Sequence, residues 1–311
     1  MTIKLLGTAA GGGFPQWNCT CANCARLRNK TLRGSSRTQV QLACELEADH
    51  WVLVNASPDL HRQIESARCL WPIQSSNRTL RQSPICGVVL TSAELDGTLG
   101  LLLLREFQPL DIYCTPSVRR ILTETNSMFR MLQRESPQAN WHDILPSKPF
   151  VLGNGLNAVR MTPISVRGKF PEYVEKEFMK KLSQDEAVIS LLIESVAGSR
   201  KLLFSPAVGQ IDERLEQSIS DSDILLWDGT FWEDDELFVV RGTGKKASEM
   251  GHLPISGVEG SLSILSGISQ KERFFIHINN TNPILDEESK EYEHVRSAGW
   301  EVAKDGMEFV L

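Results

Sequence analysis

Long apolar runs and an excess of positive charge are both missing from this sequence. The apolar stretch 99–104 ends at Arg105 and Glu106, and it is far shorter than the roughly 20 residues that cross a bilayer. The net charge is −6, so neither nucleic acid nor an anionic membrane surface is expected as the main partner. The first residues lack the basic and apolar regions of a signal peptide. We therefore expect a cytoplasmic protein without membrane insertion.

A disulfide framework is missing as well. The chain has seven cysteines, which is an odd number. Four of them lie mostly in apolar runs, as small buried side chains do: Cys44, Cys69, Cys86 and Cys114. This usage is typical of a reducing compartment.

The remaining three cysteines stand within six residues, in the pattern C-x-C-x2-C at Cys19, Cys21 and Cys24. Neighbouring thiolates repel one another, and a soft divalent cation removes that repulsion. Zinc with three sulfur ligands and one N or O ligand is the commonest solution. The spacing therefore predicts a structural Zn2+ site whose fourth ligand comes from a distant segment. The alternative is a disulfide or an accidental cluster.

Strand and helix patterns occur twice in the same order. We expect strands at 3–6, 38–46, 51–56, 85–90, 111–114, 187–194, 202–204, 224–227 and 274–277, and paired strands about a turn at 153–155 within 151–164. We expect helices at 57–67, 98–105, 117–133, 211–219, 260–265 and 287–297. Ser57 before Pro58 suits a helix N-cap, and residues 300–311 suit a hairpin about Asp305 and Gly306. No low-complexity linker divides the halves. The pattern favours a single domain, residues 1–311, of the α/β (α+β) class, with two mixed β-sheets flanked by helices in an αβ/βα sandwich.

Five blocks of the sequence together resemble one known family. They are residues 9–19, 55–59, 228–235, 249–252 and 277–286. These blocks are similar to PqqB, the family of B proteins in the biosynthesis of pyrroloquinoline quinone (PQQ), over nearly the whole chain. The resemblance implies the metallo-β-lactamase fold. More distantly, the chain is similar to a cyclic phosphodiesterase of phosphonate breakdown, which shares the three-cysteine zinc site and the closing residues 305–308.

The resemblance also implies a function. The family is thought to hydroxylate the tyrosine-derived ring of a crosslinked Glu-Tyr precursor with iron and O2. An older assignment makes it a carrier of PQQ toward the periplasm. The implied partners are the small-molecule PQQ precursor, other PQQ-biosynthesis proteins and, by analogy, a second copy in a homodimer. A third interpretation is a paralogue that acts on another aromatic small molecule.

The superfamily's metal motif, His-x-His-x-Asp-His, falls on Ser92, Glu94, Asp96 and Gly97. PqqB relatives lack the first two histidines but usually keep the last, which is Gly97 here. Asp96 and His277 remain as ligands of a second metal ion, Fe2+, and Glu94 lies on the same side of an extended segment as Asp96. The alternatives are a solvent-facing Glu94 and a His277 satisfied in the core. A standard two-zinc hydrolase is not expected, because its ligands are missing.

Further candidate site residues follow from the same resemblance. His252 matches a proposed general acid of the phosphodiesterase, and histidine exchanges protons near neutral pH; a structural hydrogen bond is the alternative. Asn280 matches the phosphodiesterase's fourth zinc ligand, and an amide oxygen is a weak ligand. Aromatic and polar groups suit a flat ring substrate, although they also pack loops. We expect substrate contacts from Gln16, Trp17, Asp228, Trp232 and Asn279.

Two functions of different classes follow. In the first, the protein is a PqqB-type hydroxylase in which His252 moves protons. In the second, it is a metal-poor binding protein for PQQ or its precursor, a function that Gly97 favours. The charged segment 168–183 is expected to be a surface loop, with a mobile flap over the site as the alternative.

Overall fold

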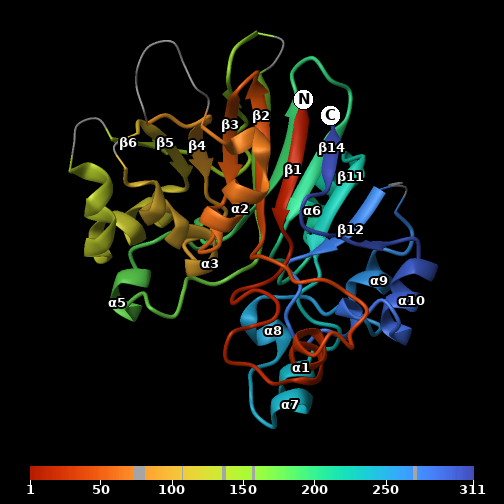
Figure 1. Ribbon diagram of the computed structural model, residues 1–311. Coiled ribbons are helices and arrows are strands. Elements are labelled where there is room, and N and C mark those ends of the chain that lie inside the picture. Colours follow the sequence, from red (N-terminus) through yellow and green to blue (C-terminus); the bar gives the residue numbers. More distant parts are fainter. Residues whose placement is uncertain (73–80, 107, 135–137, 156–157, 269–271) are drawn as a thin grey trace.

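The computed structural model describes residues 1–72, 81–106, 108–134, 138–155, 158–268 and 272–311, and in this part of the chain two seven-stranded β-sheets form a sandwich (Figure 1). The first sheet has the order β14-β1-β2-β3-β4-β5-β6, and the second has the order β13-β12-β11-β10-β9-β8-β7. Each joins an antiparallel half to a parallel half. The predicted α/β sandwich of two mixed sheets is confirmed.

The first sheet takes its strands from the beginning of the chain and from its end: β1 (Thr2–Gly7), β2 (Gln41–Glu47), β3 (His50–Val54), β4 (Ile85–Val89), β5 (Leu110–Cys114), β6 (Ala139–Asp143) and β14 (Glu308–Val310). The second sheet consists of β7 (Phe150–Leu152), β8 (Val159–Ser165), β9 (Ile189–Ser195), β10 (Lys201–Ser205), β11 (Ile224–Asp228), β12 (Glu272–Ile276) and β13 (Glu301–Val302). The sequence pattern did not predict β6.

The central strands are buried on both faces. Leu202 and Phe204 of β10 belong to the core between the sheets, whereas Leu203 packs in the outer core with Leu215 and Val295 from the helices. Because side chains alternate along a strand and both faces are covered, such strands have continuous apolar sequences. Phe204 is fully buried, and its burial stabilises the fold by about 2–3 kcal/mol.

Short helices flank the two sheets (Figure 1). They are α1 (Ala22–Arg28), α2 (Leu60–Ser66), α3 (Leu95–Thr98), α4 (Pro116–Arg120), α5 (Lys176–Met179), α6 (Glu213–Ser220), α7 (Glu236–Arg241), α8 (Ala247–Met250), α9 (Ser261–Ile264) and α10 (Lys290–Ser297). Of these, α1, α7 and α8 lie together beyond one end of the strands (Figure 1). Short 3-10 segments lie at Arg68–Leu70, Leu99–Leu104, Ser127–Gln133, Gln184–Glu186 and Pro283–Leu285. Among the residues that the structure describes, no helix combines the length and the apolarity needed to span a bilayer.

The predicted helix 117–133 is interrupted. The α-helix α4 is followed by a π turn at Ile121–Thr125 and a 3-10 segment at Ser127–Gln133. Asn126 between them has an extended backbone, and its side chain donates to the carbonyl of Ile121 at 2.9 Å. Asparagine side chains compete with helical hydrogen bonds in this way.

Two further helix predictions are corrected. The predicted helix 98–105 is a 3-10 segment preceded by α3. Ser57 is not the N-cap of α2, which begins after Asp59. The Ser57 hydroxyl donates instead to Oε1 of Gln63, at 2.9 Å.

The predicted C-terminal hairpin is wrong. β13 lies parallel to β12 in the second sheet, whereas β14 pairs antiparallel with β1 in the first. The turn at Gly306 is present, with φ of 90°, but it leads the chain from one sheet to the other. Pairing with the free edge of β1 satisfies backbone groups of that edge that a local hairpin would leave open. Asp305 fixes the crossing, because its carboxylate accepts from the Thr8 hydroxyl and the Thr38 backbone N–H, both at 2.7 Å.

Candidate functional site

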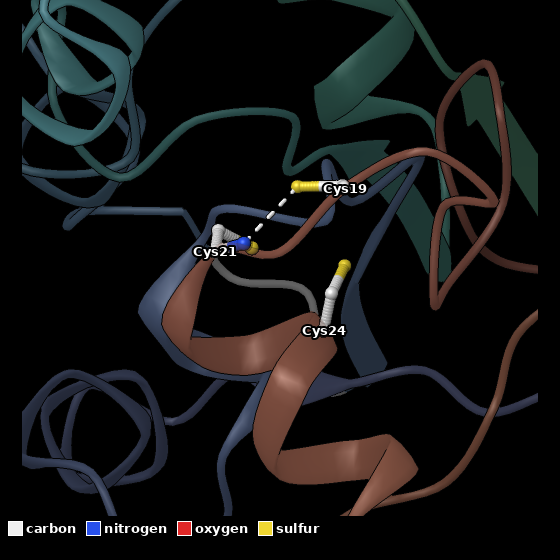
Figure 2. Close-up of side chains that lie close together, drawn as sticks. All are labelled: Cys19, Cys21 and Cys24. Carbon is white, nitrogen blue, oxygen red and sulfur yellow. Dashed lines mark hydrogen bonds between the residues drawn. The ribbon is translucent and has the colours of Figure 1, made fainter.

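Three thiols converge in the loop before α1 and in its first turn. The sulfur atoms of Cys19, Cys21 and Cys24 lie within 4.8 Å of one another, and the side chains point toward a common centre (Figure 2). The backbone N–H of Cys21 donates to the Cys19 sulfur at 3.4 Å, which is the bond drawn in Figure 2. We call residues 19–24 the cysteine loop.

Asn280 closes the open side of this thiol group. Its Nδ2 lies 3.1, 3.5 and 3.4 Å from the sulfurs of Cys19, Cys21 and Cys24. The two ends of an amide have the same shape, so a turned amide would present Oδ1 to the same three sulfurs. Asn23 anchors this segment by donating to the backbone carbonyl of Asn280 at 3.2 Å.

The electrostatics of the thiols favour a cation. Burial, with the neighbouring thiols adding to it, raises the pKa of Cys24 to about 12. Burial also acts on Cys19, but hydrogen bonds from Cys21 and Asn280 outweigh it and lower the pKa of that thiol. Three thiolates in this space are costly without a soft divalent ion. The donor set, three sulfurs and an amide, therefore fits zinc.

A cavity of about 840 Å3 opens where strands from both sheets end. Its walls come from segments that follow β1, β4, β10, β11 and β12, together with residues 168–173 and 245–252. Asp96, His252, His277 and Asn279 all line it. Ligands bind beyond the carboxyl ends of strands in folds of this kind, so the cavity is the candidate active site.

His277 stands at the end of β12 with a positive φ of 55°. Its Nδ1 lies 2.7 Å from the hydroxyl of Thr230, and its Nε2 lies 3.3 Å from Oδ2 of Asp96. The Thr230 hydroxyl donates its single proton to Asp228, at 2.6 Å. Nδ1 of His277 therefore carries the proton of its bond to Thr230, and Nε2 is the atom directed to Asp96.

His252 is held by a buried carboxylate. Its Nδ1 lies 2.7 Å from Oδ2 of Asp228, and its ring stacks on His277 with centroids 5.4 Å apart. Asp228 is wholly buried and also accepts from the backbone N–H of Val208, at 2.8 Å. Burial lowers the pKa of His252, but the charge of Asp228 and its hydrogen bond raise it by more, so the pKa lies above the ordinary value. We call Asp228, His252 and His277 the histidine group; their ligand atoms also lie within 4.8 Å of one another.

The two carboxylates after β4 differ in their charge. Burial raises the pKa of Glu94 to about 7, and the charge of Asp96 adds to the rise. Burial would also raise the pKa of Asp96, but the hydrogen bond and charge of His277 outweigh it and hold that pKa below its ordinary value. Asp96 is therefore the anionic partner of His277, whereas Glu94 is partly protonated near neutral pH.

Gly97 faces the side chain of Asn55. A Cβ at residue 97 would lie 3.3 Å from Cγ of Asn55. Asn55 has little freedom, because its Oδ1 accepts from the backbone N–H and the hydroxyl of Thr91, both at 3.0 Å. A side chain at residue 97 would therefore be bordered by a fixed amide.

Several predicted substrate residues lie elsewhere. Among the described residues that line the cavity, Asn279 is present, but Gln16, Trp17 and Trp232 are not. Trp17 is 85% exposed, and Trp232 contacts the ring of His294. Asp228 is wholly buried and lies behind the residues that line the cavity. Thr230, which joins the histidine group, was missed by sequence reasoning. The signal for it was Asp-Gly-Thr at the end of β11, since a Thr two residues after an Asp can donate back to its carboxylate.

The charged segment 168–183 contributes directly to the cavity. Its first six residues include lining residues from Gly168 to Tyr173, and α5 follows them. The Tyr173 hydroxyl donates to the carbonyl of Ala93, and the Lys169 ammonium donates to the carbonyl of Glu249. The segment thus joins two other walls of the cavity.

Comparisons with known proteins agree with this geometry. A family model described as "Beta-lactamase superfamily domain" matches residues 50–278. The chain is 42% identical to the "Coenzyme PQQ synthesis protein B" of Nitrosococcus oceani and 42% identical to that of Pseudomonas entomophila, in each case over the full length of both chains. The structure is similar to a Zn2+-bound PqqB from Methylobacterium extorquens, with a TM-score of 0.89, 35% identity and complete coverage of both chains.

A more distant solved structure shows the fold alone. A diphosphatase from the PhnP family matches with a TM-score of 0.64 and 18% identity, over 99% of this chain and 96% of that one. The full-length identities and the matched domain together show the family. The chain belongs to the coenzyme PQQ synthesis protein B (PqqB) family of the metallo-β-lactamase superfamily.

Proposed function

We propose that the protein takes part in PQQ biosynthesis by binding a small aromatic precursor in the cavity. The observation that carries this proposal is the cavity of about 840 Å3, which ends on Asp96, His252 and His277 in a chain of the PqqB family. A cavity of this size suits a small organic ligand. Acidic and basic groups at its end suit a reaction with proton transfer.

The cysteine loop holds a structural zinc ion in this proposal. Cys19, Cys21 and Cys24 are three ligands, and Asn280 is a weak fourth ligand through its amide oxygen. The donor set supports this, as does the description of the related structure as Zn2+-bound. Zinc has no redox chemistry of its own, so the ion stabilises the loop and leaves the reaction to the cavity.

The first candidate reaction is hydroxylation of the tyrosine-derived ring of the precursor. A bound Fe2+ would supply the oxygen chemistry, and Asp96 and His277 would hold it, with Glu94 as a further ligand. A mononuclear iron site has two histidines and one carboxylate. Among the described residues, no set of three or more possible ligand atoms within 4.8 Å of one another contains Glu94. Asp96 and His277 alone are one histidine short of this pattern.

The chain's own residues perform two tasks in that reaction. Thr230 fixes the tautomer of His277, so that Nε2 is turned to Asp96. Asp228 holds His252 by Nδ1 and raises its pKa, which keeps a proton available at Nε2 for exchange with the ligand.

The second candidate function is binding without a second metal, as a carrier of PQQ or its precursor. Gly97 is the observation that favours it, because this residue removes a ligand that PqqB relatives usually supply. The hydrogen bonds of Asp228 and Thr230 also satisfy Nδ1 of His252 and Nδ1 of His277 without a cation.

Metal content measured by element tests the two candidates. The protein is purified without oxygen, and Fe2+ is then added. About one zinc and one iron per chain support the hydroxylase, and an Asp96→Asn variant should then lose the iron but keep the zinc. Zinc alone, after addition of Fe2+, contradicts the hydroxylase and leaves binding of PQQ as the function to be tested.

The substitution Gly97→His sharpens this test. A gain of iron and of O2-dependent turnover indicates a damaged hydroxylase, whereas no change indicates a binding role. Gly97→Ala is the matched control, because it adds only the Cβ that approaches Asn55 at 3.3 Å. We expect either variant to lose about 1 kcal/mol of stability from this contact.

We also propose the setting of this function. The protein acts in the cytoplasm as a single domain, with other PQQ-biosynthesis proteins supplying or receiving the ligand. A homodimer is the proposed assembly. Size-exclusion chromatography with light scattering measures the assembly directly, and a monomer at all concentrations would contradict it.

A further inference from the structure

A buried carboxylate behind the cavity has no role in the site described so far. Glu236 is the first residue of α7 and is 7% exposed. Its Oε2 accepts from the backbone N–H of Trp232 at 2.6 Å, and its Oε1 accepts from the hydroxyl of Thr281. A buried carboxylate is costly unless its bonds serve the fold or the site.

The hydrogen bonds continue from Glu236 to the cavity. Nδ2 of Asn279 donates to the Thr281 hydroxyl oxygen at 2.5 Å, and Asn279 lines the cavity. The relay therefore runs from Glu236 through Thr281 to Asn279. It lies beside Asn280, so the same short segment serves the cysteine loop and the cavity.

The chemistry of Thr281 sets the direction of this relay. A hydroxyl has a single proton, and an ionised carboxylate can only accept. When Thr281 donates to Glu236, its oxygen is left to accept from Asn279. The NH2 end of the Asn279 amide then donates to Thr281. Its Oδ1 end is therefore free to accept from a ligand.

We propose that Glu236 is a positioning residue that fixes Asn279 as a hydrogen-bond acceptor in the cavity wall, so that the cavity selects ligands presenting a hydroxyl or N–H group there. The proposal rests on the proposed function in one respect, which is that the ligand is a PQQ-like ring. A quinol carries hydroxyl donors where the quinone has only carbonyl acceptors. The protein therefore binds the quinol form of PQQ more tightly than the quinone form.

The test must be made at a pH at which Glu236 is ionised. Burial raises the pKa of Glu236 to about 7, and the hydrogen bonds from Thr281 and Trp232 oppose that rise. Measurements at about pH 8 keep the carboxylate mostly ionised.

Glu236→Gln reverses the relay without changing its shape. The glutamine oxygen accepts from the Trp232 N–H, which can only donate, so the glutamine NH2 faces Thr281 and donates to it. Thr281 then donates to Asn279, whose amide turns over and presents N–H groups to the cavity. Thr281→Ser is the matched control, because it keeps the hydroxyl and therefore the original direction.

The first measurement needs no ligand. The 15N side-chain amide signal of Asn279 is identified by its loss in Asn279→Asp, and its hydrogen exchange is followed. We expect slow exchange in the wild type and in Thr281→Ser, and fast exchange in Glu236→Gln. Equal exchange in all three proteins overturns the positioning role.

The second measurement is calorimetric titration with PQQ and with its quinol, under nitrogen. We expect the wild type and Thr281→Ser to prefer the quinol by about tenfold, and Glu236→Gln to lose or reverse that preference. An unchanged preference in Glu236→Gln overturns the selection of donors. If neither form binds the wild type, the proposed function fails, while amide exchange still decides the positioning role.

Discussion

The cysteine loop and the histidine group are both sets of side chains that can hold a metal ion, but they differ in what they do without one. In the histidine group the members satisfy one another, since Asp228 bonds to His252 and Thr230 joins Asp228 to His277. In the cysteine loop, burial raises the pKa of Cys24 and the neighbouring thiols add to that rise, while a single amide faces all three sulfurs. The difference teaches that ligand-type residues indicate a metal most strongly where they repel one another.

Loss of a cysteine ligand should have the largest effect. Cys21→Ser removes a sulfur from the loop, and we expect loss of zinc together with more than about 3 kcal/mol of stability, because a structural zinc contributes its binding energy to folding. Elemental analysis and thermal unfolding measure both. Cys69→Ser is the control, because this half-buried thiol lies outside the loop. If Cys21→Ser unfolds at the same temperature as the wild type, the zinc in the cysteine loop is not structural, and the contrast between the two regions fails.

Loss of the carboxylate of the histidine group should have a smaller effect. We expect Asp228→Asn to cost about 2–3 kcal/mol, because a buried acceptor of several hydrogen bonds is weakened, while zinc stays bound. The pKa of His252 should fall, since Asp228 is what raises it, and NMR titration follows that change. Asp96→Asn serves as the control for stability, with about 1 kcal/mol or less expected at this less buried residue. Loss of zinc in Asp228→Asn would show that the two regions are not independent.

The pH dependence of stability tests two carboxylates, Glu236 and Glu94, whose pKa values are raised in the folded protein. Burial raises the pKa of both Glu236 and Glu94 to about 7. The folded protein therefore binds more protons than the unfolded chain between about pH 4.5 and 7, so stability is highest below this window and is lost as pH rises through it. The loss is about 1–3 kcal/mol for the buried Glu236, and it is smaller for Glu94, whose exposed side chain is screened by solvent. Urea unfolding across the window measures the slope. Glu236→Gln and Glu94→Gln should each flatten it, and a slope that neither variant changes refutes this origin.

Trp17 should have the smallest effect. Its side chain is 85% exposed beside the cysteine loop, so we expect Trp17→Ala to change stability by less than about 0.5 kcal/mol. Binding of PQQ should also be unchanged, because the residue does not line the cavity within the described part of the chain. Weaker binding in titrations of this variant would restore the original interpretation of Trp17 as a substrate contact.

Local patterns predicted the parts of this protein that depend on short stretches of sequence. The cysteine loop could be found from its spacing, and most strands could be found from their apolar runs, since both are set by residues close together in the chain. Asp96, His252 and His277 were named from the resemblance, and their contacts were not predicted. Those contacts depend on how the ends of β4 and β12 meet the segment after α8, which no local pattern contains.

The errors have the same physical origin. The interruption at Asn126 depends on one side chain bonding back to the carbonyl of Ile121. The relay from Glu236 to Asn279 joins residues that are separate in sequence, and only the packing of α7 against the segment after β12 brings them together.

The pairing of β14 with β1 has a consequence for how the protein is made. Thr2 pairs with Val310, so β1 leaves the ribosome long before β14, the strand that covers its outer edge. Contacts of such long sequence separation slow folding, and an uncovered edge strand invites pairing with other chains. During synthesis, the outer edge of β1 therefore stays open to pairing with other chains until residues 308–310 emerge.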